Sequence, residues 1–158
     1  LLPYDRDIYL ITDGKDATAA EGMARELSGI GLDRVAGHFV SSDLKHSPND
    51  GSLQEVPDVD GATVERSVAG GGVTLVDVRA ASEWREGHIP SARHLFLGGL
   101  PDRIEELPRD RPIVVHCQSG GRASIAASVL LARGFADVAV FPGGFAEWKA
   151  SGRAVARN

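Results

Sequence analysis

The stretch IVVHCQSGGR (residues 113–122) joins a short apolar run to a glycine-rich turn, and an Ala/Leu-rich run follows. Its first three residues are β-branched and predict a strand that ends near residue 116. Residues 122–133 predict a helix that stops at Gly134, a residue suited to a left-handed C-terminal cap. The turn between strand and helix begins with Cys117, the only cysteine of the chain. A strand that turns directly into a helix is typical of a βαβ unit and predicts parallel strands.

Short strands and helices alternate on both sides of this stretch. The expected elements are helix 61–69, strand 73–78, a short helix at 82–85, helix 101–107, strand 138–141 and a last helix that contains Trp148. Such alternation favours an α/β fold, in which right-handed crossovers place helices on both faces of a parallel sheet.

The first forty residues repeat part of this pattern, with strand 8–12, helix 18–30 and strand 34–39. Thr18 and Glu21 fit a capping box at the helix start. When this segment is slid along the chain without gaps, several of its apolar and glycine positions match the later unit, and Gly14 falls on Cys117. Two interpretations stay open: a second βαβ unit that obeys the same packing rules, or a degenerate copy that lacks the cysteine.

The segment between the two parts, residues 41–57, is rich in Ser, Asp, Pro, Asn and Gly and has no apolar period. It therefore predicts a linker. The expected organisation is a segment at 1–40, a linker at 41–57 and a domain at 58–158. A chain that opens directly on a strand also suggests a fragment of a longer protein.

Composition excludes several functional classes. The chain has 158 residues, a formal charge of -5 and few aromatic residues, which argues against a general nucleic-acid binder. Its longest apolar stretch is too short to span a bilayer, and no leader peptide opens it, so we expect a soluble, cytoplasmic protein without membrane contact. A single cysteine forms no internal disulfide, so it is either a buried apolar residue or a reactive group.

The neighbours of Cys117 favour a reactive group. In the turn that follows, successive backbone N–H groups can point into one concavity, and such a nest at a helix N-terminus binds anions and favours a thiolate. Gly120 and Gly121 allow the backbone to approach a ligand closely, and Arg122 adds a fork of donors. We therefore predict a nucleophilic cysteine, exposed and prone to oxidation.

Several motifs resemble, in content and order, the rhodanese family. They are LVDVR (75–79), Glu83, GHIP (87–90), CQSGGR (117–122), and Gly143-Gly144 followed by Trp148. The resemblance covers about residues 58–155 and implies a rhodanese α/β fold. It also implies that Cys117 carries sulfur as a persulfide and that the loop that follows cradles the substrate. The implied cradle residues are Gln118, Ser119, Gly120, Gly121 and Arg122; the implied supporting framework is Asp77, Arg79, Glu83 and His88.

Residues 1–57 resemble the degenerate rhodanese segment found in fusions with a metallo-β-lactamase-fold hydrolase. This resemblance implies an upstream hydrolase domain as a partner on the same longer chain. For the rhodanese part it implies a small sulfur donor and a thiol or cyanide acceptor, without a cofactor. The five histidines form no clustered ligand motif, so no metal site is predicted.

Two other functions fit parts of the motif. Cysteine phosphatases and arsenate reductases also follow a cysteine with an arginine, but their loop is one residue longer than the four residues between Cys117 and Arg122. A non-catalytic, regulatory rhodanese-like module is the second alternative, since a fold alone does not prove activity. Because Arg122 is the only charged loop side chain, we expect a persulfide donor to be used better than doubly charged thiosulfate.

Overall fold

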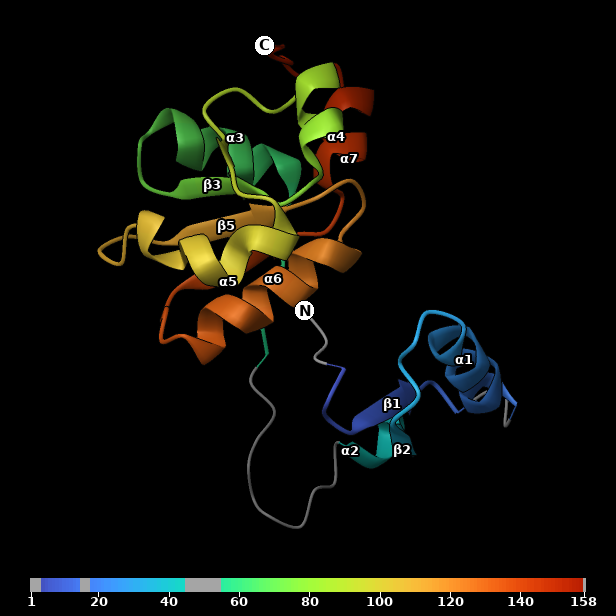
Figure 1. The fold of residues 1–158 in the computed structure, drawn as a ribbon. Coiled ribbons are helices and arrows are strands. Elements are labelled where there is room, and N and C mark those ends of the chain that lie inside the picture. Colours follow the sequence, from blue (N-terminus) through green and yellow to red (C-terminus); the bar gives the residue numbers. More distant parts are fainter. Residues whose placement is uncertain (1–3, 15–17, 45–54, 158) are drawn as a thin grey trace. The chain divides into compact units, whose positions relative to one another are not determined.

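The chain divides into two units, Leu1–Gln54 and Glu55–Asn158, each with its own parallel sheet. The computed structural model describes residues 4–14, 18–44 and 55–157. In Figure 1 the first unit carries the blue and cyan elements, and the second unit runs from green to red.

The sheet of the second unit has four strands in the order β4-β3-β5-β6, and all neighbouring strands are parallel. Their bounds are β3 Thr74–Asp77, β4 Arg93–His94, β5 Ile113–His116 and β6 Val138–Phe141. The register places Asp77 opposite His116, and His116 opposite Phe141. The residues that follow these strands therefore meet at one edge of the sheet, where α/β folds bind ligands. The predicted α/β fold is confirmed.

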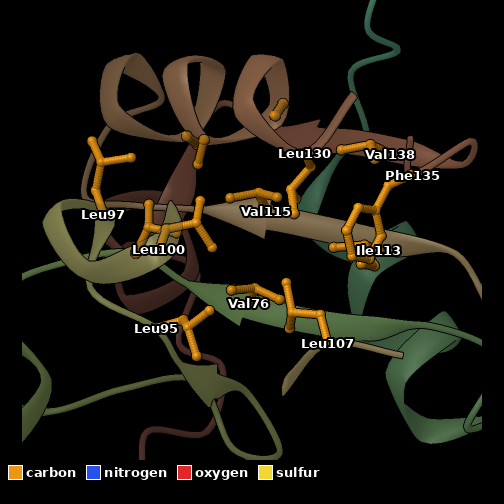
Figure 2. Close-up of a cluster of buried hydrophobic side chains, with 14 of the residues drawn as sticks. Val76, Leu95, Leu97, Leu100, Leu107, Ile113, Val115, Leu130, Phe135 and Val138 are labelled. Carbon is orange, nitrogen blue, oxygen red and sulfur yellow. The ribbon is translucent and has the colours of Figure 1, made fainter. Parts of the chain in front are cut away.

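Helices cover both faces of this sheet, as Figure 1 shows. On one face, α5 (Leu100–Arg103) and α6 (Gly121–Ala132) pack on alternate strand residues such as Val76 and Val115. Figure 2 shows part of this apolar cluster. On the other face, α3 (Gly61–Ala69) and α7 (Gly144–Ala150) contribute to a second cluster that includes Leu75 and Val114. Because strand side chains alternate between faces, each central strand is buried on both sides, which explains its continuous apolar sequence.

Two elements of this unit differ from the predictions. Strand β4 was not predicted, because its two residues are too few to show a period. The predicted helix 101–107 is instead the short α5 between two 3₁₀ turns, η1 (Leu97–Gly99) and η2 (Ile104–Glu106). Leu107, which precedes a proline, has extended backbone, so the helix cannot continue. The predicted helix 82–85 is α4, Ala81–Glu86.

The first unit is a single βαβ arrangement. Its strands β1 (Ile8–Thr12) and β2 (Val35–Val40) are parallel, and α1 (Ala19–Ser28) connects them. The capping box predicted at Thr18 is wrong, because this residue has helical backbone angles and its side chain makes no capping hydrogen bond to α1.

The segment predicted as a linker, residues 41–57, begins with the short helix α2 (Ser41–Leu44). At its other end, Pro57 accepts a hydrogen bond from the backbone of Val140 (2.9 Å), next to strand β6. The predicted linker therefore begins with a helix, and its residues 45–54 lie outside the described residues. No helix in the described ranges is long and apolar enough to cross a membrane.

Candidate active site

Cys117 directly follows β5, a central strand of the sheet, at the edge where the strand ends meet. Its side chain is recessed, and the residue is only 2% exposed. The expectation of an exposed thiol is therefore wrong, because Cys117 belongs to the buried apolar cluster under α6. The residues that follow it, Gln118 and Ser119, are exposed and form the rim above it.

The turn after Cys117 has the backbone geometry that the glycines predict. Gly120 has φ +93°, a left-handed conformation that favours glycine, and it is the N-cap of α6. The first backbone hydrogen bond of the helix runs from Ser124 N–H to Gly120 O (3.0 Å). The N–H groups of residues 121–123 precede the helix's own bonds, so they are the free donors that an anion uses at a helix N-terminus.

The loop carbonyls are bound by the start of α7. Phe145 N–H donates to Cys117 O (2.8 Å), and Ala146 N–H donates to Gln118 O (3.1 Å). Close approach is possible because Gly144 has φ +57° and no side chain; a Cβ there would overlap the Cys117 carbonyl. The glycine pair at the start of α7 therefore has a role in shaping the cysteine loop.

Arg122, on the first turn of α6, forms a two-armed ion pair with Glu83 on α4. Arg122 Nη1 and Nη2 donate to Glu83 Oε2 and Oε1 at 2.6 and 2.8 Å. These hydrogen bonds hold the pKa of Glu83 at about 2. They also raise the pKa of Arg122, to which the charge of Cys117 contributes further, so the guanidinium stays charged beside the cysteine. The donor fork that the sequence predicts for a ligand is thus bound to Glu83.

Asp77 and Arg79 form a buried pair beneath the loop. Arg79 Nη2 lies 2.6 Å from Asp77 Oδ2, and the two side chains are 1% and 0% exposed. Arg79 also donates to Gly87 O (2.8 Å) and lies over the Phe145 ring (4.0 Å). Its remaining nitrogen, Nη1, is 3.5 Å from Gln118 Oε1. The pair therefore connects strand β3 to the loop.

His88 is held in a stack of rings next to this pair. Its ring lies 3.6 Å from that of Trp84, centroid to centroid, and the His94 ring stacks on Trp84 at 4.9 Å. His88 Nδ1 lies 3.1 Å from Trp84 O, and His94 Nε2 lies 2.8 Å from Arg79 O. These contacts hold the His88 ring against Trp84 of α4.

His116 is fully buried directly before the cysteine. Burial lowers its pKa, and the Asp77 carboxylate offsets this only in part, so the ring stays neutral. The Nδ1 atom of His116 lies 3.2 Å from Cys117 O, which can accept a hydrogen bond from it. The Nε2 atom lies 3.7 Å from Asp77 Oδ2. The ring therefore contacts the backbone of Cys117. Nowhere in residues 4–14, 18–44 and 55–157 do three or more His, Cys, Asp or Glu side chains gather to hold a metal ion.

Sequence reasoning missed the groove that lies beside the loop. This cavity of about 310 Å³ is lined by Arg79, Glu83, Glu86, Gln118, Phe145, Lys149, Val155 and Arg157. Lys149 stands one helical turn after Phe145, and this i, i+4 spacing on a helix next to the loop is the signal that could have found it. The segment around Val155 carried no signal, because its antiparallel bridge from Ala156 to His88 joins distant residues.

The arrangement matches known proteins. "Thiosulfate sulfurtransferase GlpE" of Pseudomonas savastanoi pv. phaseolicola is 40% identical over 80 residues, which are 51% of this chain and 76% of that protein. A "Sulfurtransferase" of Allochromatium vinosum is 38% identical over 80 residues, 51% of this chain and 75% of that protein. The crystal structure of the Alr3790 protein from Anabaena sp. superposes with a TM-score of 0.58 at 30% identity, over 63% of this chain and 82% of that chain. Residues 61–151 match the model of the rhodanese-like domain, and the chain belongs to this family.

Proposed function

We propose that this chain is a rhodanese-type sulfurtransferase that carries sulfur on Cys117 as a persulfide. The observation that supports this most is the position of Cys117, recessed beside the free N–H groups of the first turn of α6. Curated relatives with sulfurtransferase names at 40% and 38% identity support the same reaction class.

In the first half of the reaction, the Cys117 thiolate attacks the outer, sulfane sulfur of the donor. A bond forms between the Cys117 sulfur and the sulfane sulfur, while the bond between that sulfur and the rest of the donor breaks. The donor remainder leaves with the electron pair, as a thiolate from a persulfide or as sulfite from thiosulfate. The N–H groups at the start of α6 stabilise the negative charge of the persulfide.

In the second half, a nucleophilic acceptor, a thiolate or cyanide, attacks the outer sulfur of the Cys117 persulfide. The S–S bond breaks and the cysteine thiolate is restored, so no net oxidant or reductant is needed. The outer sulfur stands about 2 Å beyond the cysteine sulfur, the length of an S–S bond. This extension brings the transferable atom from its recess toward the rim at Gln118 and Ser119, where an acceptor approaches.

For the donor, we propose a persulfide in preference to thiosulfate. The only charged loop side chain, Arg122, is bound through both arms to Glu83. A doubly charged donor therefore gains little from that guanidinium, whereas a persulfide, with one negative charge, is served by the loop amides. The test is kcat/KM for glutathione persulfide against thiosulfate at equal ionic strength; a higher value for thiosulfate contradicts the preference.

The Glu83–Arg122 pair also argues against a phosphatase-like reaction. A phosphate or arsenate needs an arginine fork turned toward the oxyanion, and here the fork is directed at Glu83.

Intact-mass measurement tests the sulfurtransferase proposal directly. The reduced protein is exposed to glutathione persulfide or thiosulfate, with Cys117→Ser as the matched control, and then to cyanide. We expect the mass of one sulfur atom, about 32 Da, to be gained only by the unsubstituted protein and to be removed by cyanide. Without a gain from either donor, the proposed function is wrong, and a non-catalytic module is the better interpretation.

For residues 1–40, we propose a degenerate rhodanese-like segment, in which Gly14 occupies the position of the cysteine. The parallel strands β1 and β2 around α1 support this, since they follow the same order as β5, α6 and β6. The hydrolase partner rests on the resemblance alone. The mass of the native polypeptide, measured in cell extract with an antibody to residues 55–158, tests whether a hydrolase domain is joined to this chain.

A further inference from the structure

The groove beside the cysteine loop has the size and position of a subsite. Gln118, the loop residue after the nucleophile, lines it together with Glu83, the partner of Arg122. On the other side, α7 and the C-terminal segment contribute Lys149 and Arg157. Its volume of about 310 Å³ corresponds to the lower end of the range for small-molecule sites. The groove is therefore large enough for more than a sulfur atom.

The groove carries charges that the fold does not use. Within the described ranges, Lys149 has no acidic partner within ion-pair distance, and Arg157 donates only its Nε, to the backbone oxygen of Glu86 (3.1 Å). The Glu86 carboxylate is likewise without an ion pair among those residues. By contrast, the other charged lining residues, Arg79 and Glu83, are bound to Asp77 and Arg122. Two cations and one carboxylate thus remain for a ligand.

Between these charges the groove has an apolar floor. Phe145 is 8% exposed, and Val155 is half-buried beside it. Such a floor packs against methylene groups, while the charges above it bind the ends of a flexible molecule. Thiosulfate is compact and has neither an apolar body nor an ammonium group, so it leaves these features unused.

We propose that this groove binds the amino-acid end of a small carboxylate-bearing thiol, or of its persulfide, whose sulfur reaches Cys117. Lys149 and Arg157 bind the carboxylate, Glu86 binds the ammonium group, and Phe145 and Val155 contact the methylene chain. This inference rests on the proposed sulfur transfer and names the class of molecule that delivers or receives the sulfur. The two cations are binding residues and take no part in breaking the S–S bond.

Equilibrium binding tests the groove without any sulfur transfer. The probe is S-methylglutathione, which cannot accept sulfur, titrated by calorimetry into the full chain. We expect Lys149→Gln and Arg157→Gln each to raise Kd about five- to tenfold, as for a partly exposed charge-assisted contact, and Lys149→Arg to preserve it. Arg111→Gln removes an exposed charge outside the groove and serves as the matched control. Absence of binding, or equal Kd values in all variants, would overturn the proposal.

Transfer kinetics give the second readout. The sulfur-loaded protein is mixed with glutathione or with neutral 2-mercaptoethanol. The rate constant for glutathione is divided by that for 2-mercaptoethanol, and this ratio is compared between variants. We expect this ratio to fall about tenfold in Lys149→Gln and further in the double variant with Arg157→Gln. An unchanged ratio overturns the subsite. If instead Cys117 takes up no sulfur although S-methylglutathione binds as expected, the proposed function fails and the binding groove stands.

The contact of Glu86 with an ammonium group is tested with cysteine and N-acetylcysteine as acceptors. We expect Glu86→Gln to slow transfer to cysteine several-fold more than transfer to N-acetylcysteine, which has no ammonium group. Equal slowing with both thiols would remove Glu86 from the subsite.

Discussion

Glu83 and Arg122 are 39 residues apart in sequence, yet their side chains meet through two hydrogen bonds of 2.6 and 2.8 Å. The pair joins α4 to the first turn of α6, directly beside the cysteine loop. It holds the arginine in a fixed direction, and it occupies one N–H of each terminal nitrogen, so fewer donors remain for a substrate. Stability and donor choice therefore depend on the same contact.

The pair makes stability depend on acidity in a defined range. The pKa of Glu83 is about 2 in the folded chain, against 4.5 as its ordinary value. Between these values the unfolded chain binds a proton that the folded chain does not, so stability falls as the pH is lowered from about 4.5 to 2. We expect Glu83→Gln to cost about 1 kcal/mol or less at pH 6, because water screens a pair this exposed.

Urea unfolding at pH 6 and pH 3 measures this contribution. The difference between the unsubstituted protein and Glu83→Gln should shrink at pH 3 and in high salt. A difference that grows toward low pH would contradict the sign of the effect.

Arg122→Ala is expected to weaken donor use while the cysteine stays reactive. The substitution removes a permanent charge near Cys117 and leaves the loop amides in place. We expect kcat/KM for the donor to fall about tenfold, because the thiolate loses a nearby positive charge that favours it. Stopped-flow sulfur loading measures it, and labelling of Cys117 with a small alkylating agent verifies the thiol. Loss of all labelling would show that Arg122 shapes the fold of the loop.

Arg79→Met is expected to destabilise the second unit strongly. The guanidinium is 1% exposed and binds an Asp77 carboxylate that is 0% exposed, so the substitution leaves a buried charge without its partner. Such breaks cost about 3–5 kcal/mol. The double variant with Asp77→Asn should lose less than the sum of the two single variants, because no buried charge is left alone. Denaturant unfolding of the four proteins gives the coupling free energy, and strict additivity would be evidence against the pair.

Gly144→Ala and Gly152→Ala form a matched comparison. Both glycines have positive φ, +57° and +73°, so both substitutions strain the backbone by about 1 kcal/mol. A Cβ at Gly144 also meets the carbonyls of Cys117 and Gln118, whereas nothing lies within 4 Å of a Cβ at Gly152. We expect the first substitution to disrupt sulfur loading and to cost at least about 2 kcal/mol. The second should leave loading intact; equal effects would mean that backbone strain alone matters.

Local patterns predicted the parts of the site that are continuous in sequence. The loop at 117–122 follows from glycines placed between a strand and a helix, and the structure has both glycines at the start of α6. Contacts between residues that are distant in sequence could not be predicted. The pairing of Glu83 with Arg122 depends on how α4 approaches α6. The sequence predicted a donor fork at Arg122 but not its partner, because neither helix alone shows the other.

Burial of the nucleophile was also missed. A residue at the end of a strand can face solvent or the core, and for Cys117 the packing of α6 against the sheet decides it. Likewise, the two residues of β4 form a strand only because β3 lies beside them. The sequence motif singled out Cys117, but the tertiary packing sets how far its side chain is exposed.

The hydrogen bonds from α7 to the loop carbonyls have a consequence for the dynamics of transfer. With the oxygens of Cys117 and Gln118 bound to Phe145 and Ala146, these two peptide planes cannot rotate freely. The dipoles around the sulfur are thus oriented during folding, before any charge arrives. When an anion enters or a persulfide forms, the backbone has little need to reorganise, and the barrier to transfer contains little work of turning dipoles.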